Sequence, residues 1–205
     1  MSKQGYHHGD LRRALVEAAL RLIEEKGPTG FTLSEAAKTA GVTPAAVYRH
    51  FAGREDLITE CARQGFLIFG DLLEHAWNRG KPSALTAFSA VGRAYLAFAK
   101  RYPGHYMAMF ESGLSPQTSD VVGQVALKAR QVMDQATEAL LAHIPAERRP
   151  PVAMVSAHIA AMSHGVIELH ARPPAGSSSP YSPEDLLESG VGIYLRGLGI
   201  LPPDR

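Results

Sequence analysis

The stretch that decides the fold runs from Phe31 to Phe51 and reads FTLSEAAKTAGVTPAAVYRHF. Its opening is typical of a helix start. The Thr32 hydroxyl can accept the amide of Glu35 while the Glu35 carboxylate returns to the Thr32 amide, an arrangement called a capping box. We expect this helix to cover residues 33–40. Gly41 can end it, because glycine readily adopts the left-handed backbone conformation found after helices.

A second short helix follows the glycine. Thr43 can cap it, and Pro44 suits its first position because the missing amide hydrogen has no partner there. The expected length is about eight residues, or roughly 12 Å. Two short helices joined by a tight turn form a helix-turn-helix, whose second helix enters the major groove of DNA. This stretch therefore predicts a DNA-binding element.

The second helix offers two kinds of contact. Its N-terminal residues are short, which permits close approach and methyl contacts with thymine. The next residues could reach phosphates: Tyr48, Arg49 and His50. Arg54 opens another helix, where the macrodipole disfavours a cation, so a phosphate would offset that cost. The alternatives are structural: Tyr48 packs, His50 caps a helix, and Arg54 pairs with Glu55 or solvent.

Helical spacing extends over the rest of the chain. Apolar residues recur at steps of three and four, and no run alternates apolar and polar residues as a strand would. We predict an all-α fold of about nine helices, with a three-helix N-terminal head containing the helix-turn-helix and a larger C-terminal bundle. The head should cover residues 1–56, and the remainder residues 57–205.

Composition excludes several classes of protein. The 205 residues are 45% hydrophobic and 20% charged, which is typical of a globular protein and unlike a disordered or collagenous one. A single cysteine cannot form an internal disulfide. The polar N-terminus lacks an apolar signal core, and the apolar segment 152–171 contains several polar side chains. We expect a soluble, cytoplasmic protein.

The net charge argues against DNA binding, whereas the helix-turn-helix motif argues for it. The formal charge is +1, and residues 1–56 contain eight Lys and Arg against seven Asp and Glu. Nucleic-acid binders usually carry a basic excess. Local placement of Arg49 and Arg54 beside Tyr48 and His50 matters more than the total. The near-balance predicts modest non-specific affinity for DNA.

The N-terminal quarter resembles the tetracycline-repressor (TetR) family of bacterial transcriptional regulators. The resemblance rests on YHHGDLRRALVEAALRLIEEKG followed by GFTLSEAAKTAGVTPAAVYRHFAGREDLI, within about residues 6–60. It implies DNA-contacting positions at the start of the first motif helix, base-proximal positions in the second helix, and backbone-contacting positions after it. Those residues are Thr32 and Ser34, then Thr43, Pro44 and Ala45, then Tyr48, His50 and Arg54. Arg49 stands where the family often has an aromatic residue, so its role is less defined.

The family resemblance also implies a function. It predicts a ligand-responsive regulator, a repressor that binds a palindromic DNA operator as a homodimer and is released by a small molecule. Residues 1–56 would then be the DNA-binding domain, and residues 57–205 the ligand-binding and dimerisation domain. The two long helices expected at residues 151–171 and 183–198 would form the interface with the partner subunit. Small and apolar residues suit that contact: Ala157, Ala161, Gly165, Val166, Leu187, Gly190, Ile193 and Gly197. The alternative is that these helices are internal core.

Large, soft side chains gather between Phe66 and Phe110. A cavity lined by aromatic residues and methionines would suit an apolar or aromatic small molecule. In the resembling family the pocket lies among the middle helices, which makes seven residues candidates for its lining: Tyr95, Phe98, Tyr106, Phe110, Met133, His158 and Met162. The alternative is that each is simply core.

No catalytic, cofactor or metal site is predicted. His164 and Glu168 are spaced i, i+4 and could share a metal, but a buried, hydrogen-bonded histidine is the simpler interpretation. Cys61 has no base beside it in the sequence, and no GxSxG, P-loop, GxGxxG or HExxH pattern occurs. An all-α enzyme, or a helix-turn-helix protein that binds another protein, are the alternatives from other classes.

Overall fold

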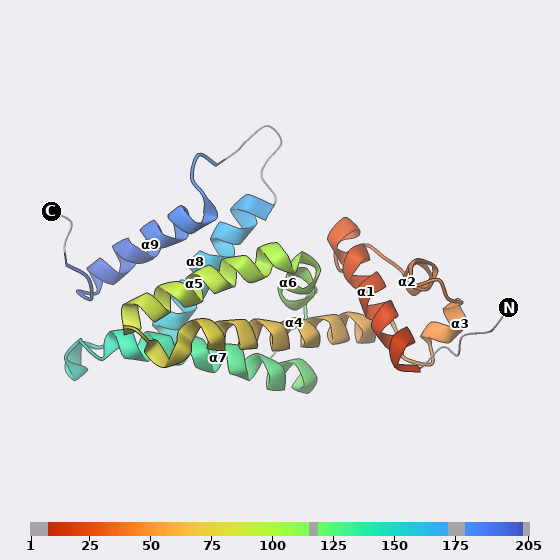
Figure 1. Ribbon diagram of the computed structural model, residues 1–205, viewed down its shortest axis with the longest axis horizontal. Helices are drawn as coiled ribbons and strands as arrows, with labels where there is room; N and C mark the ends of the chain where they lie inside the picture. Colours follow the sequence, from red (N-terminus) through yellow and green to blue (C-terminus); the bar gives the residue numbers. More distant parts are fainter. Residues whose placement is uncertain (1–7, 115–118, 172–178, 203–205) are drawn as a thin grey trace. The chain divides into compact units, whose positions relative to one another are not determined.

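The computed structural model describes residues 8–114, 119–171 and 179–202 (Figure 1). Within these ranges the regular structure is entirely helical, which confirms the predicted class and the expected nine α-helices. The first group is α1 (His8–Lys26), α2 (Leu33–Thr39), α3 (Pro44–Val47) and α4 (Arg54–Trp77). The second group is α5 (Ala84–Arg101), α6 (Pro103–Phe110), α7 (Asp120–Leu141), α8 (Val152–Ala171) and α9 (Pro183–Gly197). Two 3-10 helices occupy Asn78–Gly80 and Ala146–Arg148.

The chain divides into two compact units. The first unit comprises residues 1–68 and 101–126, and the second comprises residues 69–100 and 127–205. Helices α1 to α3, the N-terminal part of α4, and α6 therefore belong to the first unit. The boundary that we predict after residue 56 stays a prediction, because this division describes contacts within the chain and tests no function.

The first unit is built on the apolar face of α1. Leu15 and Ile23 of α1 are fully buried, together with Phe31 and Phe51, which flank the helix-turn-helix. Helix α6 packs against the same helix. At this contact the carboxylate of Glu24 accepts the main-chain N–H of Gly104 at 3.1 Å. Gly104 admits no larger residue there without a shift, because an added Cβ would lie 2.8 Å from the Leu20 carbonyl oxygen.

The sole cysteine lies in this core. The Cys61 side chain on α4 is fully buried, and its thiol lies 4.0 Å from the Val16 carbonyl oxygen on α1. Burial raises the pKa of the Cys61 thiol to about 12. Because the thiolate is the reactive form, this cysteine is an inert core residue.

The second unit has an aromatic centre. The ring of Phe69 on α4 contacts the rings of Tyr95 and Phe98 on α5, with centroids 4.7 and 4.9 Å apart. Helices α8 and α9 pack against each other. Among the described residues, α8 is the one helix long and apolar enough to cross a membrane, with 33% of its most apolar window buried. Core helices of folded bundles share this length and composition.

Candidate nucleic-acid interface and ligand cavity

The capping box forms as predicted. The Thr32 hydroxyl accepts the N–H of Glu35 at 3.2 Å, and the Glu35 carboxylate accepts the N–H of Thr32 at 2.8 Å. The ammonium of Lys26 on α1 also hydrogen-bonds to Glu35. The Lys26 ammonium, the Thr32 N–H and the Thr32 hydroxyl, which donates to the same carboxylate at 2.9 Å, lower the pKa of Glu35 to about 2. The start of α2 is therefore tied both to its own turn and to α1.

The second motif helix differs from the expectation in two respects. Gly41 has φ +72° and ends the preceding helix as predicted. Thr43 precedes α3, but its side chain makes no capping hydrogen bond. Helix α3 covers only the four residues Pro44–Val47, half the expected length. The chain then turns, with the N–H of Phe51 donating to the Val47 carbonyl at 3.0 Å. Val47 and Phe51, on either side of this turn, are both buried.

The base-proximal candidates are accessible. Helices α2 and α3 lie next to each other beside α1 (Figure 1). Exposed side chains occur in all three of the family-derived groups, whereas Val47 is fully buried beneath α3. The exposed candidates are Thr32, Ser34, Thr43, Pro44, Ala45, Tyr48 and Arg49, with 63% of Tyr48 exposed. His50 and Arg54 are half-buried.

Arg54 has a structural role that the sequence did not predict. Its guanidinium donates to the main-chain oxygen of Thr29 at 2.9 Å and to that of Phe31 at 3.4 Å. These bonds hold the loop before α2 against the start of α4. They correct our alternative expectation of a pair with Glu55 or solvent, and they supply acceptors that offset the position of a cation at a helix start.

Arg12 is a second arginine that the sequence reasoning missed. Its guanidinium lies 4.6 Å from the centroid of the Phe51 ring and donates to the His50 carbonyl at 3.2 Å. It also pairs with Glu60 on α4 at 3.1 Å. The side-chain hydrogen bond from Arg63, with help from Gln64 and Arg12, lowers the pKa of Glu60 to about 2. Arg12 therefore fixes the turn after α3, and nothing local in the sequence signals this long-range contact.

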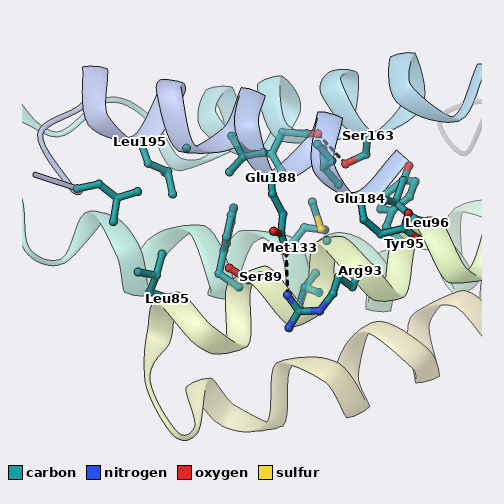
Figure 2. Close-up of a pocket in the computed structure, with 18 residues that line it drawn as sticks. Leu85, Ser89, Arg93, Tyr95, Leu96, Met133, Ser163, Glu184, Glu188 and Leu195 are labelled. Atoms are coloured by element: carbon teal, nitrogen blue, oxygen red, sulfur yellow. Dashed lines mark hydrogen bonds and ion pairs between the residues drawn. The ribbon is translucent and has the colours of Figure 1, made fainter. Parts of the chain in front are cut away.

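A cavity of about 250 Å³ lies in the second unit (Figure 2). Residues of α5 and α9 form most of its wall, with Met133 from α7 and Ile159 and Ser163 from α8. It extends from Leu85 and Leu195 at one end to Tyr95 and Leu96 at the other.

Two of the seven predicted lining residues, Tyr95 and Met133, border the cavity, and the other five lie elsewhere. Phe98 is fully buried against Phe69. Tyr106 and Phe110 belong to the first unit, where their rings contact each other at 5.0 Å. His158 pairs with the Tyr194 hydroxyl at 2.9 Å, and Met162 lies near Gly190, outside the lining.

Hydrogen bonds within the chain already engage two of the hydroxyl groups of the lining. The Tyr95 hydroxyl and Nε2 of His164 are 2.8 Å apart, and the Ser163 hydroxyl donates to the Ile159 carbonyl at 3.0 Å. Burial lowers the pKa of His164, although the nearby Glu168 carboxylate acts in the opposite sense. No group of three or more potential metal-ligating side chains occurs among the described residues.

The predicted interface residues fall into two sets. Val166 and Leu187 are buried inside the chain's own second unit. For these two residues the structure agrees with the alternative, in which they belong to the internal core. The remaining residues lie at or near the surface of α8 and α9, with Ile193 63% exposed. They are Ala157, Ala161 and Gly165 on α8, and Gly190, Ile193 and Gly197 on α9. Met154 and Leu169 extend the exposed apolar face of α8.

Comparisons with known proteins cover both parts of the chain. Residues 15–61 match the family described as bacterial regulatory proteins of the tetR family. Residues 88–194, more than half of the chain, match the tetracyclin repressor-like C-terminal domain. The chain belongs to the TetR family. Members of the TetR family are transcriptional regulators with a helix-turn-helix DNA-binding domain, and they are not enzymes.

Relatives in the TetR family match different lengths of this chain. The HTH-type transcriptional regulator BetI of Rhizobium meliloti is 40% identical over 73 residues, which is 36% of this chain and 34% of that protein. The match thus spans about a third of that relative. BetI of Brucella anthropi is 26% identical over 190 residues, covering 91% of this chain and 94% of that protein.

Solved structures show the TetR-family fold along nearly the whole chain. A protein of unknown function from Rhodococcus sp. RHA1 has a TM-score of 0.75 and 26% identity, covering 95% of this chain and 98% of that one. The TetR-family regulator PfmR from Thermus thermophilus has a TM-score of 0.68 and 19% identity, covering 89% of this chain and 97% of that one. The latter likeness shows the fold alone.

Proposed function

We propose that this protein is a ligand-responsive repressor that binds a palindromic operator as a homodimer and is released by a small molecule. The observation that carries the proposal is the surface at α3. Thr43, Pro44 and Ala45 are short and exposed, while Val47 anchors the helix from below. Such a helix can approach base edges closely, and contacts through methyl groups suit thymine. The cellular site of this activity is the bacterial cytoplasm, where the DNA lies.

The phosphate contacts that we propose come from the residues after α3. Tyr48 and Arg49 are exposed and can hydrogen-bond to the DNA backbone, which fixes the position of the protein without reading sequence. His50 and Arg54 are half-buried, and the Arg54 guanidinium also binds the main chain of the loop before α2. Arg54 would thus act on DNA partly by positioning α2.

The exposed face of α8 and α9 supports a homodimer. Ala157, Ala161 and Gly165 recur at steps of four along α8 and permit close helix contact, and the exposed Ile193 on α9 supplies apolar area. A two-fold dimer presents two recognition helices to major grooves about 34–36 Å apart, which requires a palindromic operator.

The cavity supports control by a small molecule. Release requires that the ligand prefer the conformation that does not fit the operator, and a tenfold loss of DNA affinity needs about 1.4 kcal/mol of coupling. Helix α4 contributes residues to both compact units, so a displacement along it could carry that coupling.

A mobility-shift experiment with the DNA that flanks its own gene tests the proposal. We expect salt-sensitive, sequence-selective binding that exceeds binding to random DNA of the same length. The variant Ala45→Glu, which places a negative charge at the base-proximal surface, should abolish the selective component. Ala97→Glu adds the same charge at an exposed position of α5 and serves as the control. Weak binding of equal strength to both DNAs would contradict the operator proposal.

A further inference from the structure

The cavity in the second unit has an apolar interior. Side chains from four helices face it, including Phe88 on α5, Ile159 on α8 and Leu195 on α9, these three all buried. The hydroxyls of Tyr95 and Ser163 are engaged by His164 and by the Ile159 carbonyl. The burial of apolar surface would therefore favour a ligand that placed an apolar part in this interior.

The volume of the cavity limits the size of the ligand. About 250 Å³ of space corresponds to roughly eight water-sized groups, each of which occupies about 30 Å³ in a liquid. A chain or ring of about eight carbon atoms would fill the cavity. A larger molecule would extend past the mouth.

Charged side chains lie on two facing walls of this cavity. Arg93 on α5 and Glu188 on α9 form an ion pair at 3.1 Å that joins the two opposing walls (Figure 2). Glu184 also lines the cavity, one helical turn before Glu188 on the same face of α9. The Glu184 carboxylate also acts on the ring of His170, which lies outside the lining, so the lining residues themselves carry two carboxylates and one guanidinium.

This balance favours one sign of ligand charge. The N-terminus of α9 contributes about half a positive charge near Glu184, which leaves the lining negative. An anionic group would meet two carboxylates, and the single guanidinium is already paired. A cationic group would instead relieve the repulsion between two like charges spaced i, i+4. We infer that the cavity binds a small amphipathic cation, with an apolar body of about eight carbon atoms inside and an ammonium or amidinium group beside Glu184 and Glu188.

This inference rests on the proposed function only for its effect on DNA, since binding can be measured separately. The probes are octylammonium, octanoate and 1-octanol, which share one chain and differ in head group. Calorimetric titration of the full chain should give the tightest binding for octylammonium. Preference for octanoate, equal affinity for all three, or binding of none would overturn the inference.

Variants test the role of each charge. Glu184→Gln and Glu188→Gln should each weaken octylammonium binding by about tenfold, because each removes a charge-assisted hydrogen bond. Glu147→Gln removes the same charge at an exposed position outside the cavity and should change nothing. Arg93→Gln removes a competing cation and should strengthen octylammonium binding by about threefold. Weaker binding by the Arg93 variant, or unchanged binding by both glutamate variants, would contradict the assignment.

The same probe separates this inference from the proposed function. If octylammonium binds as described but leaves operator affinity unchanged, the cavity assignment stands and release by this site is wrong. If octylammonium does not bind and another class of molecule releases the operator, the proposed function stands and the assignment of a cationic ligand is wrong.

Discussion

The Glu24 carboxylate on α1 accepts the main-chain N–H of Gly104 in the first turn of α6, at 3.1 Å. The first amides of a helix have no partner within the helix, so an acidic side chain from a neighbouring helix satisfies one of them. The contact is close on both sides, since a Cβ at residue 104 would lie 2.8 Å from the Leu20 carbonyl and 2.9 Å from the Glu24 carboxylate. Glycine is therefore the residue that lets α1 and α6 meet.

We expect Gly104→Ala to destabilise the protein by about 1–3 kcal/mol, the usual cost of forcing an extra group into a packed contact. Denaturant unfolding followed by circular dichroism measures the change. Gly192→Ala is the matched control, because its Cβ would make only ordinary contacts at 3.6 Å within a helix. That control should be neutral or slightly stabilising. Equal stability of Gly104→Ala and the parent protein would show that α6 can move away from α1 at no cost.

Tyr48→Phe should weaken binding to operator and random DNA by a similar factor, since a phosphate contact carries no sequence information. The loss of one hydrogen bond to a charged group corresponds to about tenfold in affinity. Stability should not change, because the side chain is 63% exposed. Tyr181→Phe removes an equally exposed hydroxyl on the second unit and should leave DNA affinity as it is.

Arg54→Ala should differ from Tyr48→Phe in one respect. It removes the two bonds to the Thr29 and Phe31 carbonyls, so the free energy of unfolding should fall by about 1–3 kcal/mol together with DNA affinity. Paired measurements of unfolding and mobility shift distinguish the two variants. A loss of DNA binding with full stability would assign Arg54 to the phosphate backbone alone.

Ile193→Arg should convert the proposed homodimer to a monomer, because it places a charge on the exposed apolar face of α9. Sedimentation equilibrium should give a mass near twice 22.1 kDa for the parent chain and near 22.1 kDa for the variant. Leu127→Arg introduces the same side chain at an exposed position of α7, 48% accessible, and should remain dimeric. A parent protein that sediments as a monomer at micromolar concentration would contradict the dimer itself.

His170 should make stability depend on pH. Its two ring nitrogens lie 2.9 Å from the Val166 carbonyl and 3.1 Å from the Tyr181 carbonyl. Carbonyls only accept hydrogen bonds, so both contacts form when the ring is an imidazolium. The Tyr181 and Val166 carbonyls, and then the Glu184 carboxylate, raise the pKa of His170. The resulting stabilisation is complete below the pKa of the unfolded state and is lost as pH rises through the higher folded pKa.

Two measurements check this prediction. Proton NMR titration should show the His170 ring titrating above its ordinary range, and unfolding should show stability falling across the same interval. His170→Gln should flatten that fall, whereas His143→Gln removes an exposed imidazole outside this contact and serves as the control. A His170 ring that titrates below its ordinary value would show that the two carbonyl contacts do not form in solution.

Local signals predicted the start of the motif but neither the length of its second helix nor the long-range contacts beside it. The Thr32 capping box and the turn at Gly41 depend on residues within a few positions, so spacing alone predicts them. After α3, the ring of Phe51 lies against the guanidinium of Arg12, a residue 39 positions away in the sequence. No local pattern predicts such a contact.

The lining of the cavity also depends on contacts between residues that are far apart in the sequence. The sequence shows large, soft side chains between Phe66 and Phe110, but only Tyr95 and Met133 among the seven chosen residues border the space. Its charged lining joins Arg93 to Glu188, residues 95 positions apart. Such a pair exists only once α5 and α9 are packed, so helical periodicity identifies each helix without revealing which faces enclose a cavity.

The buried thiol of Cys61 has a practical consequence for spectroscopy. Its fully enclosed side chain and raised pKa leave it unreactive toward thiol reagents near neutral pH. A cysteine introduced at the exposed Ala97 would therefore be the only site on the chain to accept a spin label or fluorophore. The native sequence thus permits distance measurements between labelled copies without first removing a cysteine.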